Sequence, residues 1–353
     1  MNSDCWTCVF LHVERDLRAK VRLVCRDWAA ILNSGLLWLD VGENLRWMYC
    51  HTACAYGNLV AAQWLTVTFG LTAADIRADD NSALLGSCAN GHLEVAQWLV
   101  STFGLAADDA RADDNFALRC SSANGHLVVA QWLVSAFGLT AEDARAECNY
   151  ALRYTCMYGH LEVAQWLVST FGLTAKDARA DYNYALRSSC RDGHLAVAQW
   201  LVAAFGLTAE DARADSNYAL LMTCANGELE VAQWLVAAFN LKAADVRANT
   251  VFALRFSCAN GHLGVAQWLV STFGLTADDA RADDNWALRY SCACGHLAEA
   301  QWLAATFALT AADARADDDH ALRYSCECGH LVVARWLVSA FGLEPHCEQC
   351  RPQ

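Results

Sequence analysis

Apolar and polar positions repeat along most of the chain with a period of 34 residues. Tryptophan marks this period most clearly, because it recurs at one position in nine successive copies. These tryptophans are Trp64, Trp98, Trp132, Trp166, Trp200, Trp234, Trp268, Trp302 and Trp336. Such a period is typical of solenoids, in which each copy is one supersecondary unit. Since one copy cannot bury its own apolar face, we expect the copies to stack.

The second half of each copy predicts an amphipathic helix. In the copy from 140 to 173, apolar residues cover a broad face over 161–171, so this helix should be largely buried. Gly159 precedes it and Gly172 follows it, where a helix end favours a residue that tolerates positive φ. The nine equivalent tryptophans, Trp166 among them, are expected to form a buried spine.

The first half of the copy predicts a second helix, at least over 150–157. Thr140 has the character of an N-cap, and acidic residues follow it in the first turn. Glu147-Cys148-Asn149 is weak helix material. The sequence leaves open whether 140–157 is one long helix or a short turn followed by a helix.

Eight of the 18 cysteines follow the repeat at a single position. One repeat position holds Cys54, Cys88, Cys156, Cys190, Cys224, Cys258, Cys292 and Cys326, with Ser122 in the remaining copy. Equivalent positions in stacked helices lie about 10 Å apart, which exceeds the ~7 Å between Cα atoms that a disulfide spans. We therefore expect small buried thiols between helices and a reducing compartment.

The net charge of −14 is unevenly distributed. Residues 1–50 carry six basic and six acidic side chains, so the whole excess lies in the repeats. An acidic array repels phosphate backbones, which argues against nucleic acid and favours a basic or neutral protein partner. No apolar run of 18 residues occurs, so no membrane association is expected. We expect a monomer in the cytoplasm, with the nucleus as an alternative.

The segment YALRYTCMYGHLEVAQWLV at 150–168 resembles the ankyrin repeat, and the match recurs over about 47–343. The Gly-His turn is its most specific part and appears in seven of nine copies, Asn58 and Glu228 being the exceptions. The resemblance implies a protein-binding solenoid of helix-turn-helix copies. It also implies that the histidine is structural and bridges neighbouring copies. These histidines are His92, His126, His160, His194, His262, His296 and His330.

The chain departs from the ankyrin pattern in its connectors. The family's Thr-Pro and Asp-Gly turns are absent, and the only prolines are Pro345 and Pro352. We therefore expect helical or irregular connectors rather than β-hairpin fingers, and an all-α fold. The tetratricopeptide repeat shares the period, but its Gly-Tyr/Ala/Pro signature does not fit.

Positions that vary between copies are candidates for target binding. One follows the Ala-Leu-Arg segment, and the resemblance places it on the concave face. Its proposed target-binding residues are Tyr154, Met222, Phe256, Tyr290 and Tyr324, and the other copies have Gly86, Cys120 and Ser188 there. A second variable position precedes Ala-Leu, and is either an interface or half-buried packing. It holds Ser82, Phe116, Tyr150, Tyr184, Tyr218, Phe252, Trp286 and His320. The acidic segments between copies are either a recognition rim or a solvated edge.

Residues 1–46 lack the repeat, and their segment ERDLRAKVRLVCRDWAAILNSGLLW at 14–38 resembles an F-box. The opening Leu-Pro of that motif is absent. The resemblance implies binding to the adaptor Skp1. The residues implied are Phe10, Leu17, Val24, Trp28 and Trp38. The alternative is a helical cap on the solenoid.

Recognisable catalytic chemistry is sparse, since the sequence shows no phosphate loop or metalloprotease helix. Cys5-x-x-Cys8 and Cys347-x-x-Cys350 lack a second pair at zinc-finger spacing, so we expect no metal, cofactor or catalytic residue. The sequence thus predicts an F-box-like module (1–46), a solenoid (47–343) and a C-terminal tail (344–353). The expected function is target recruitment to a Skp1-cullin-F-box ubiquitin ligase; the alternative is a plain ankyrin scaffold.

Overall fold

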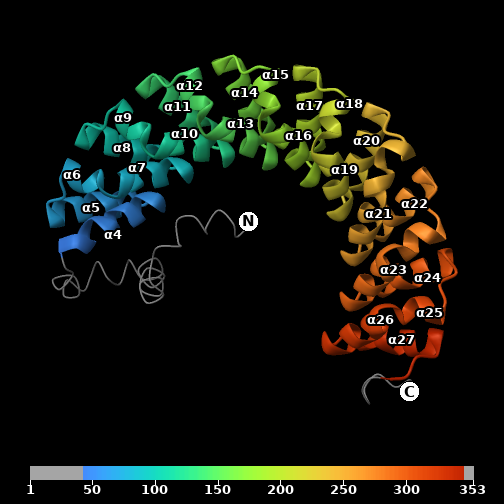
Figure 1. The fold of residues 1–353 in the computed structure, drawn as a ribbon. Coiled ribbons are helices and arrows are strands. Elements are labelled where there is room, and N and C mark those ends of the chain that lie inside the picture. The colour runs from blue at the N-terminus through green and yellow to red at the C-terminus, as the bar shows by residue number, and fades with distance from the viewer. Residues whose placement is uncertain (1–42, 346–353) are drawn as a thin grey trace.

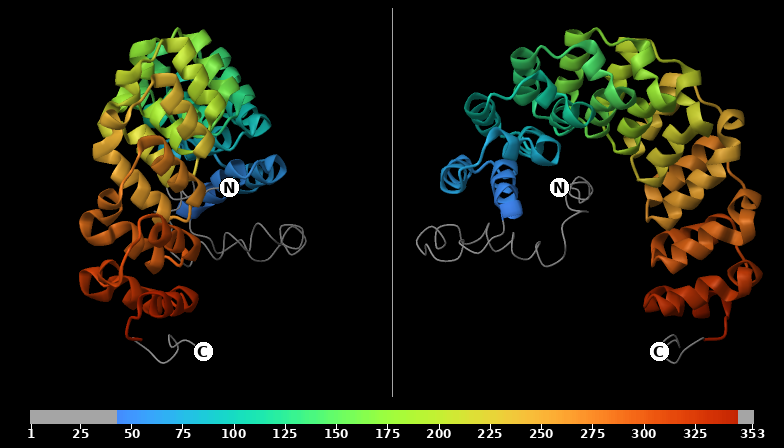
Figure 2. Two further views of the ribbon diagram at one scale, coloured as in Figure 1. Left: turned by 90° about the vertical axis from the view of Figure 1, so that its right-hand side faces the viewer. Right: turned by 60° about the vertical axis from the view of Figure 1, so that its left-hand side comes forward.

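The computed structural model describes residues 43–345, and for 43–46 and 243–250 only the course of the backbone. This part of the chain is a helical solenoid whose copies stack side by side into an open arc (Figures 1 and 2). No strand occurs within these residues, so the predicted all-α class and the absence of β-hairpin fingers there are confirmed. None of the helices described has the length and hydropathy needed to cross a membrane.

One helix of each copy lines the inside of the arc (Figure 1). Each of these inner helices packs against the inner helix of the next copy. They are α4 (Glu43–Ala55), α7 (Ala78–Ala89), α10 (Ala112–Ala123), α13 (Ala146–Met157), α16 (Ala180–Arg191), α19 (Ala214–Ala225), α21 (Ala243–Ala259), α23 (Ala277–Ala293) and α26 (Ala316–Glu327).

The outer helices form the convex side and correspond to the predicted second helix (Figure 1). They are α5 (Leu59–Phe69), α8 (Leu93–Phe103), α11 (Leu127–Phe137), α14 (Leu161–Phe171), α17 (Leu195–Phe205), α20 (Leu229–Phe239), α22 (Leu263–Phe273), α24 (Leu297–Thr306) and α27 (Leu331–Phe341). In α14, Gly172 at the C-terminal end has φ 60°, the left-handed conformation that the sequence predicts there.

A four-residue helix precedes most inner helices and forms the connector between copies. These helices are α6 (Ala73–Ile76), α9 (Ala107–Ala110), α12 (Ala141–Ala144), α15 (Ala175–Ala178), α18 (Ala209–Ala212) and α25 (Ala311–Ala314). Thr140 is the N-cap of α12, as predicted. The region 140–157 is thus a short helix followed by a longer one, which settles the alternative that the sequence left open.

Leucine, alanine and cysteine fill the core between the two layers. Leu152 of α13 and Leu167 of α14 are fully buried, as are their equivalents in the neighbouring copies. Small side chains such as Ala164, also fully buried, allow helices to approach closely. Burying one leucine contributes roughly 1.5–3 kcal/mol, so this layer supplies much of the stability.

The predicted buried tryptophan spine is wrong. Trp64 is 38% exposed, and Trp166 and its equivalents are only half-buried against the edge of the core. The tryptophans from Trp98 to Trp336 each pack edge-on against the phenylalanine five residues later, as Trp166 does against Phe171 at 5.9 Å between ring centroids. The fully buried stripe of the outer helix passes through Leu167 instead, because this stripe is too narrow to enclose an indole as well.

The repeated cysteines other than Cys326 are buried free thiols, which confirms the prediction for Cys54, Cys156 and Cys292 among others. The prediction is wrong for Cys326, which is half-buried and disulfide-bonded. Cys326 lies in α26, and within the described residues no further inner helix packs over it.

Candidate protein-binding surface

A short left-handed turn leads into the inner helices wherever the structure describes this junction. In α13, Glu147, Cys148 and Asn149 have φ values of 51°, 54° and 62°. Left-handed backbone costs an L-residue roughly 1–2 kcal/mol, and Asp and Asn tolerate it best. The third turn residue is Asn in most of these copies, for example Asn149 and Asn183. The turn explains why this segment is weak helix material, and it sets where each inner helix starts.

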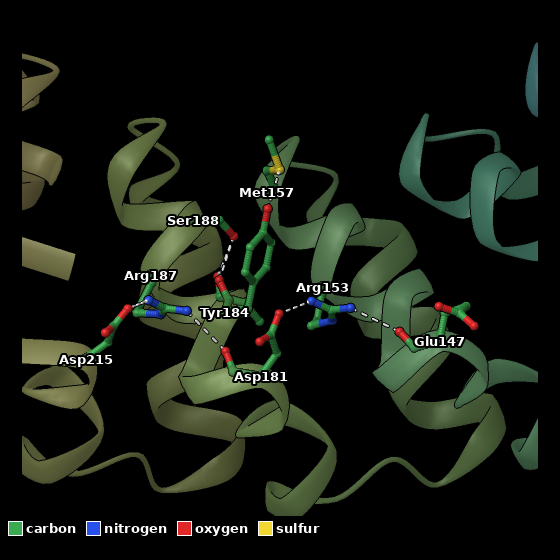
Figure 3. Close-up of polar contacts among 9 residues, drawn as sticks. Glu147, Arg153, Met157, Asp181, Tyr184, Arg187, Ser188 and Asp215 are labelled. Atoms are coloured by element: carbon green, nitrogen blue, oxygen red, sulfur yellow. Dashed lines mark hydrogen bonds and ion pairs between the residues drawn. The ribbon is translucent and has the colours of Figure 1, made fainter. Parts of the chain in front are cut away.

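An arginine further along the inner helix holds this left-handed turn in place through hydrogen bonds (Figure 3). Arg153 Nη2 donates to the carbonyl oxygen of Glu147 at 3.0 Å. Its Nη1 forms an ion pair with the carboxylate of Asp181, which belongs to the turn of the next copy. Its guanidinium also lies 5.0 Å from the ring centroid of Tyr184. One side chain therefore fixes two turns and one ring of the inner face.

This arrangement repeats in neighbouring copies. Arg187 bonds the carbonyl of Asp181 and the carboxylate of Asp215 (Figure 3). Arg255 and Arg289 form the corresponding ion pairs with Asp283 and Asp317. The Ala-Leu-Arg triplet was visible in the sequence as a marker of the repeat, but its structural role was not predicted, because the arginine's carboxylate partner lies 28 residues away.

The two variable positions of the inner helix form one stack of aromatic rings. Tyr150 and Tyr154 stack at 3.9 Å between centroids, and Tyr154 contacts Tyr184 of the next copy at 5.5 Å. For the variable position that precedes Ala-Leu, the sequence left open an interface or half-buried packing. Tyr150 and Tyr184 are half-buried, so packing describes these two residues. The hydroxyl of Tyr184 also donates to Met157 Sδ at 3.3 Å (Figure 3), and burial raises the pKa of Tyr184 to about 12.

A longer run of rings covers the C-terminal copies. Along α21, α23 and α26 the successive ring contacts join Phe252, Phe256, Trp286, Tyr290, His320 and Tyr324. Phe252 is 44% exposed, and Phe256 and Tyr324 are each 38% exposed. Apolar rings exposed side by side are typical of protein interfaces.

The residues predicted to bind a target all lie on inner helices, at the inside of the arc (Figure 1). Phe256, Tyr290 and Tyr324 belong to the longer run of rings, and Tyr154 belongs to the stack that it forms with Tyr150 and Tyr184. Met222 is half-buried on α19 and belongs to neither group of rings. The structure brings Phe252 and Trp286 into the same surface, where the sequence left their role open.

A second ladder of ion pairs joins the connectors. Arg145, at the end of α12, donates from Nε and Nη2 to the carboxylate of Asp177 in α15 at 2.8 and 3.2 Å. The same carboxylate accepts the N–H and hydroxyl of Thr174. Burial raises the pKa of Asp177, but the bonds from Arg145 and Thr174 outweigh it, so the pKa is lowered overall. The equivalent pairs in other copies, such as Arg179 with Asp211, link successive connectors in the same way.

The repeated histidines lie between copies, as the resemblance implied. The ring of His194 lies against Gly159 so closely that a Cβ on this glycine would meet Nδ1 at 2.6 Å. Gly159 also has φ 80°, so both its conformation and its neighbour require glycine. At this edge Glu228 takes the histidine position and lies against Gly193. A pocket of 790 Å³ opens there, and Glu228, Arg191 and Asp192 are among the residues that line it.

The remaining predicted sites lie outside the described residues. They are the Skp1-binding set Phe10, Leu17, Val24, Trp28 and Trp38, and the two Cys-x-x-Cys pairs. Among the residues whose side chains the structure describes, no group of three or more His, Cys, Asp or Glu is placed to hold a metal ion. No protein-family model and no curated protein matches the chain.

Proposed function

We propose that this protein is a protein-binding solenoid that holds a target against the inner face of its arc and performs no catalysis itself. The supporting observation is the run of contacting rings from Phe252 to Tyr324, formed by positions that vary between copies, in which Phe252, Phe256 and Tyr324 are exposed. Rings held in place by neighbouring helices lose little conformational entropy on binding, which favours them as interface anchors.

Target capture by the full chain tests this proposal. The variant combines Tyr154→Ala, Phe256→Ala and Tyr290→Ala. The control combines Val128→Ala and Val332→Ala, which remove exposed side chains of the outer helices α11 and α27, 62% and 66% exposed. We expect the control to recover the same proteins from a lysate and the ring variant to lose them while keeping its helical circular dichroism. Equal recovery by both would count against the inner face.

We further propose that the solenoid serves as the target-recruiting part of a Skp1-cullin-F-box ubiquitin ligase. Support comes from the sequence of 14–38 alone, where Leu17, Val24 and Trp28 occupy positions of the F-box pattern. The test is capture of purified Skp1 by the intact protein, by a version lacking 1–42, and by a Leu17→Ala/Trp28→Ala variant. Capture by the intact protein only is the expected result. If Skp1 is not captured at all, the ligase role is wrong and a scaffold with an N-terminal cap remains.

A further inference from the structure

We propose that the inner face binds a basic segment of its partner in an extended, polyproline-II-like conformation, with one lysine or arginine for each copy of the solenoid. This inference rests on the proposed function and adds the chemistry, conformation and residue spacing of the bound segment. Three observations carry it: the charge along one edge of the inner face, the exposed rings beside that edge, and the distance between copies.

The left-handed turns place a row of carboxylates along one edge of the inner helices. Several are exposed and have no ion pair within the described residues. They are Asp79, Asp80, Asp113, Asp114, Glu147, Asp284 and Asp318. Arg153, Arg187 and Arg289 do not cancel this charge for a partner, because they are buried and already paired with other carboxylates. Arg119 and Arg323 donate to backbone carbonyl oxygens, those of Asp113 and Asp318. The edge therefore attracts cations.

Rings of this run lie close to such turns along the chain. Trp286, which is half-buried, comes two residues after Asp284, and the exposed Phe252 directly precedes Ala-Leu at the equivalent position of α21. The chain itself holds cations over such rings, as Arg255 does over Phe252 at 5.2 Å. A partner's lysine or arginine can lie with its alkyl chain on the rings and its charge toward the carboxylates. A purely apolar segment would leave the carboxylates without a cationic partner, so the surface favours a basic segment.

The spacing of the copies selects the conformation. Packed helices lie about 8–10 Å apart, which sets the step from one copy to the next. A polyproline-II segment rises about 3.1 Å per residue with three residues per turn, so every third side chain lies on one face about 9 Å from the last. A bound α-helix is a straight rod, whereas the inner face curves through the whole arc (Figure 1). An extended segment can follow that curve over many copies.

Fluorescence anisotropy with the full chain and labelled synthetic peptides tests this inference at 150 mM salt. One peptide repeats Lys-Gly-Pro six times. A second has the same composition with the lysines at irregular intervals, and a third places six lysines at every seventh position of a helix-forming sequence. We expect the first peptide to bind at least tenfold more tightly than the others. Two variants, Phe252→Ala/Phe256→Ala and Asp284→Asn/Asp318→Asn, should each weaken it several-fold, and Val128→Ala/Val332→Ala should not.

Each contrary result has a distinct meaning. Equal binding of the regular and irregular peptides would overturn the one-per-copy spacing, and tighter binding of the helical peptide would overturn the extended conformation. If none of the peptides binds, the basic partner is wrong. The proposed function is judged separately, by whether target capture depends on Tyr154, Phe256 and Tyr290.

Discussion

Arg187 forms an ion pair with Asp215, which lies in the left-handed turn of the next copy. The arginine side chain is 9% exposed and the aspartate side chain 52%, so the pair joins a buried cation to a solvated carboxylate. The same guanidinium bonds the turn of its own copy through the carbonyl oxygen of Asp181 at 3.2 Å. The pair therefore couples the stacking of two inner helices to the shape of the edge that we propose for binding.

The chain itself contains a variant of this pair. In the next copy Leu221 takes the place of the arginine, and Asn249 takes the place of the aspartate that would have met it. We predict that Arg187→Leu lowers the free energy of unfolding by about 2 kcal/mol, since it removes hydrogen bonds of a charged group. Asp215→Asn should cost under about 1 kcal/mol, because the carboxylate is half exposed. Urea unfolding should show that the double variant loses about 0.5–1 kcal/mol less stability than the sum of the two single losses. Strictly additive losses would show that the two residues do not interact.

Ala308 follows the outer helix α24 at the position where the other copies have glycine, except for Asn240 after α20, and its φ is 49°. Glycine has no Cβ to strain in this conformation, so Ala308→Gly should raise the free energy of unfolding by about 1 kcal/mol. The matched change is Gly274→Ala, at φ 61° with no atom within 4 Å of the new Cβ. It should lower stability by a similar amount through the backbone alone. Thermal unfolding of the two variants measures both changes in stability. A lower stability of Ala308→Gly than of the unmodified protein would contradict this reasoning.

His51 in α4 is buried, and burial lowers its pKa to about 4. Its Nε2 donates to the carbonyl oxygen of Asp75 at 3.2 Å, and Nδ1 bonds the hydroxyl of Ser82. Because the folded pKa lies below the unfolded value of about 6.5, the neutral ring stabilises the fold fully above that pH. This contribution is lost as the pH falls from about 6.5 to 4, by up to about 3 kcal/mol.

Hydrogen exchange of the α4 and α7 amides between pH 7.5 and 4.5 measures this loss in the first copy. We expect the opening free energy of these helices to fall as the pH falls. A His51→Gln variant should start lower and change less over the same range. If the two proteins show the same pH slope after correction for intrinsic exchange, His51 does not cause the loss.

Thiol labelling distinguishes the repeated cysteines from the variable ones. Cys156, Cys190 and Cys224 are fully buried, and burial raises the pKa of each thiol. Cys148 and Cys328 are exposed. At pH 8 we expect an alkylating reagent to modify Cys148 and Cys328 within minutes and the buried three only in urea, as mass spectrometry can follow site by site. Rapid labelling of Cys156 in the native protein would mean that the inner helices are not closely packed.

The outer helix was largely predictable from its residues. In α14 the apolar stripe, Gly159 before it and Gly172 after it are local signals, and the structure follows them. Trp166 was misplaced because the apolar pattern gives the direction of a side chain but not how much neighbouring helices cover it. The aromatic positions Tyr154 and Phe256 were identified because comparison between copies separates variable from repeated residues.

The period, the pairing of helices, the caps and the acidic character of the chain follow from the amino-acid sequence alone, because each depends on residues close together along it. What Arg153 and Asp181 do, which rings stack and how far each side chain is exposed depend on the tertiary structure. These features arise from contacts about 28 to 34 residues apart, between copies whose relative position is set by packing. The inner face is therefore a product of stacking, although each of its residues belongs to an ordinary helix.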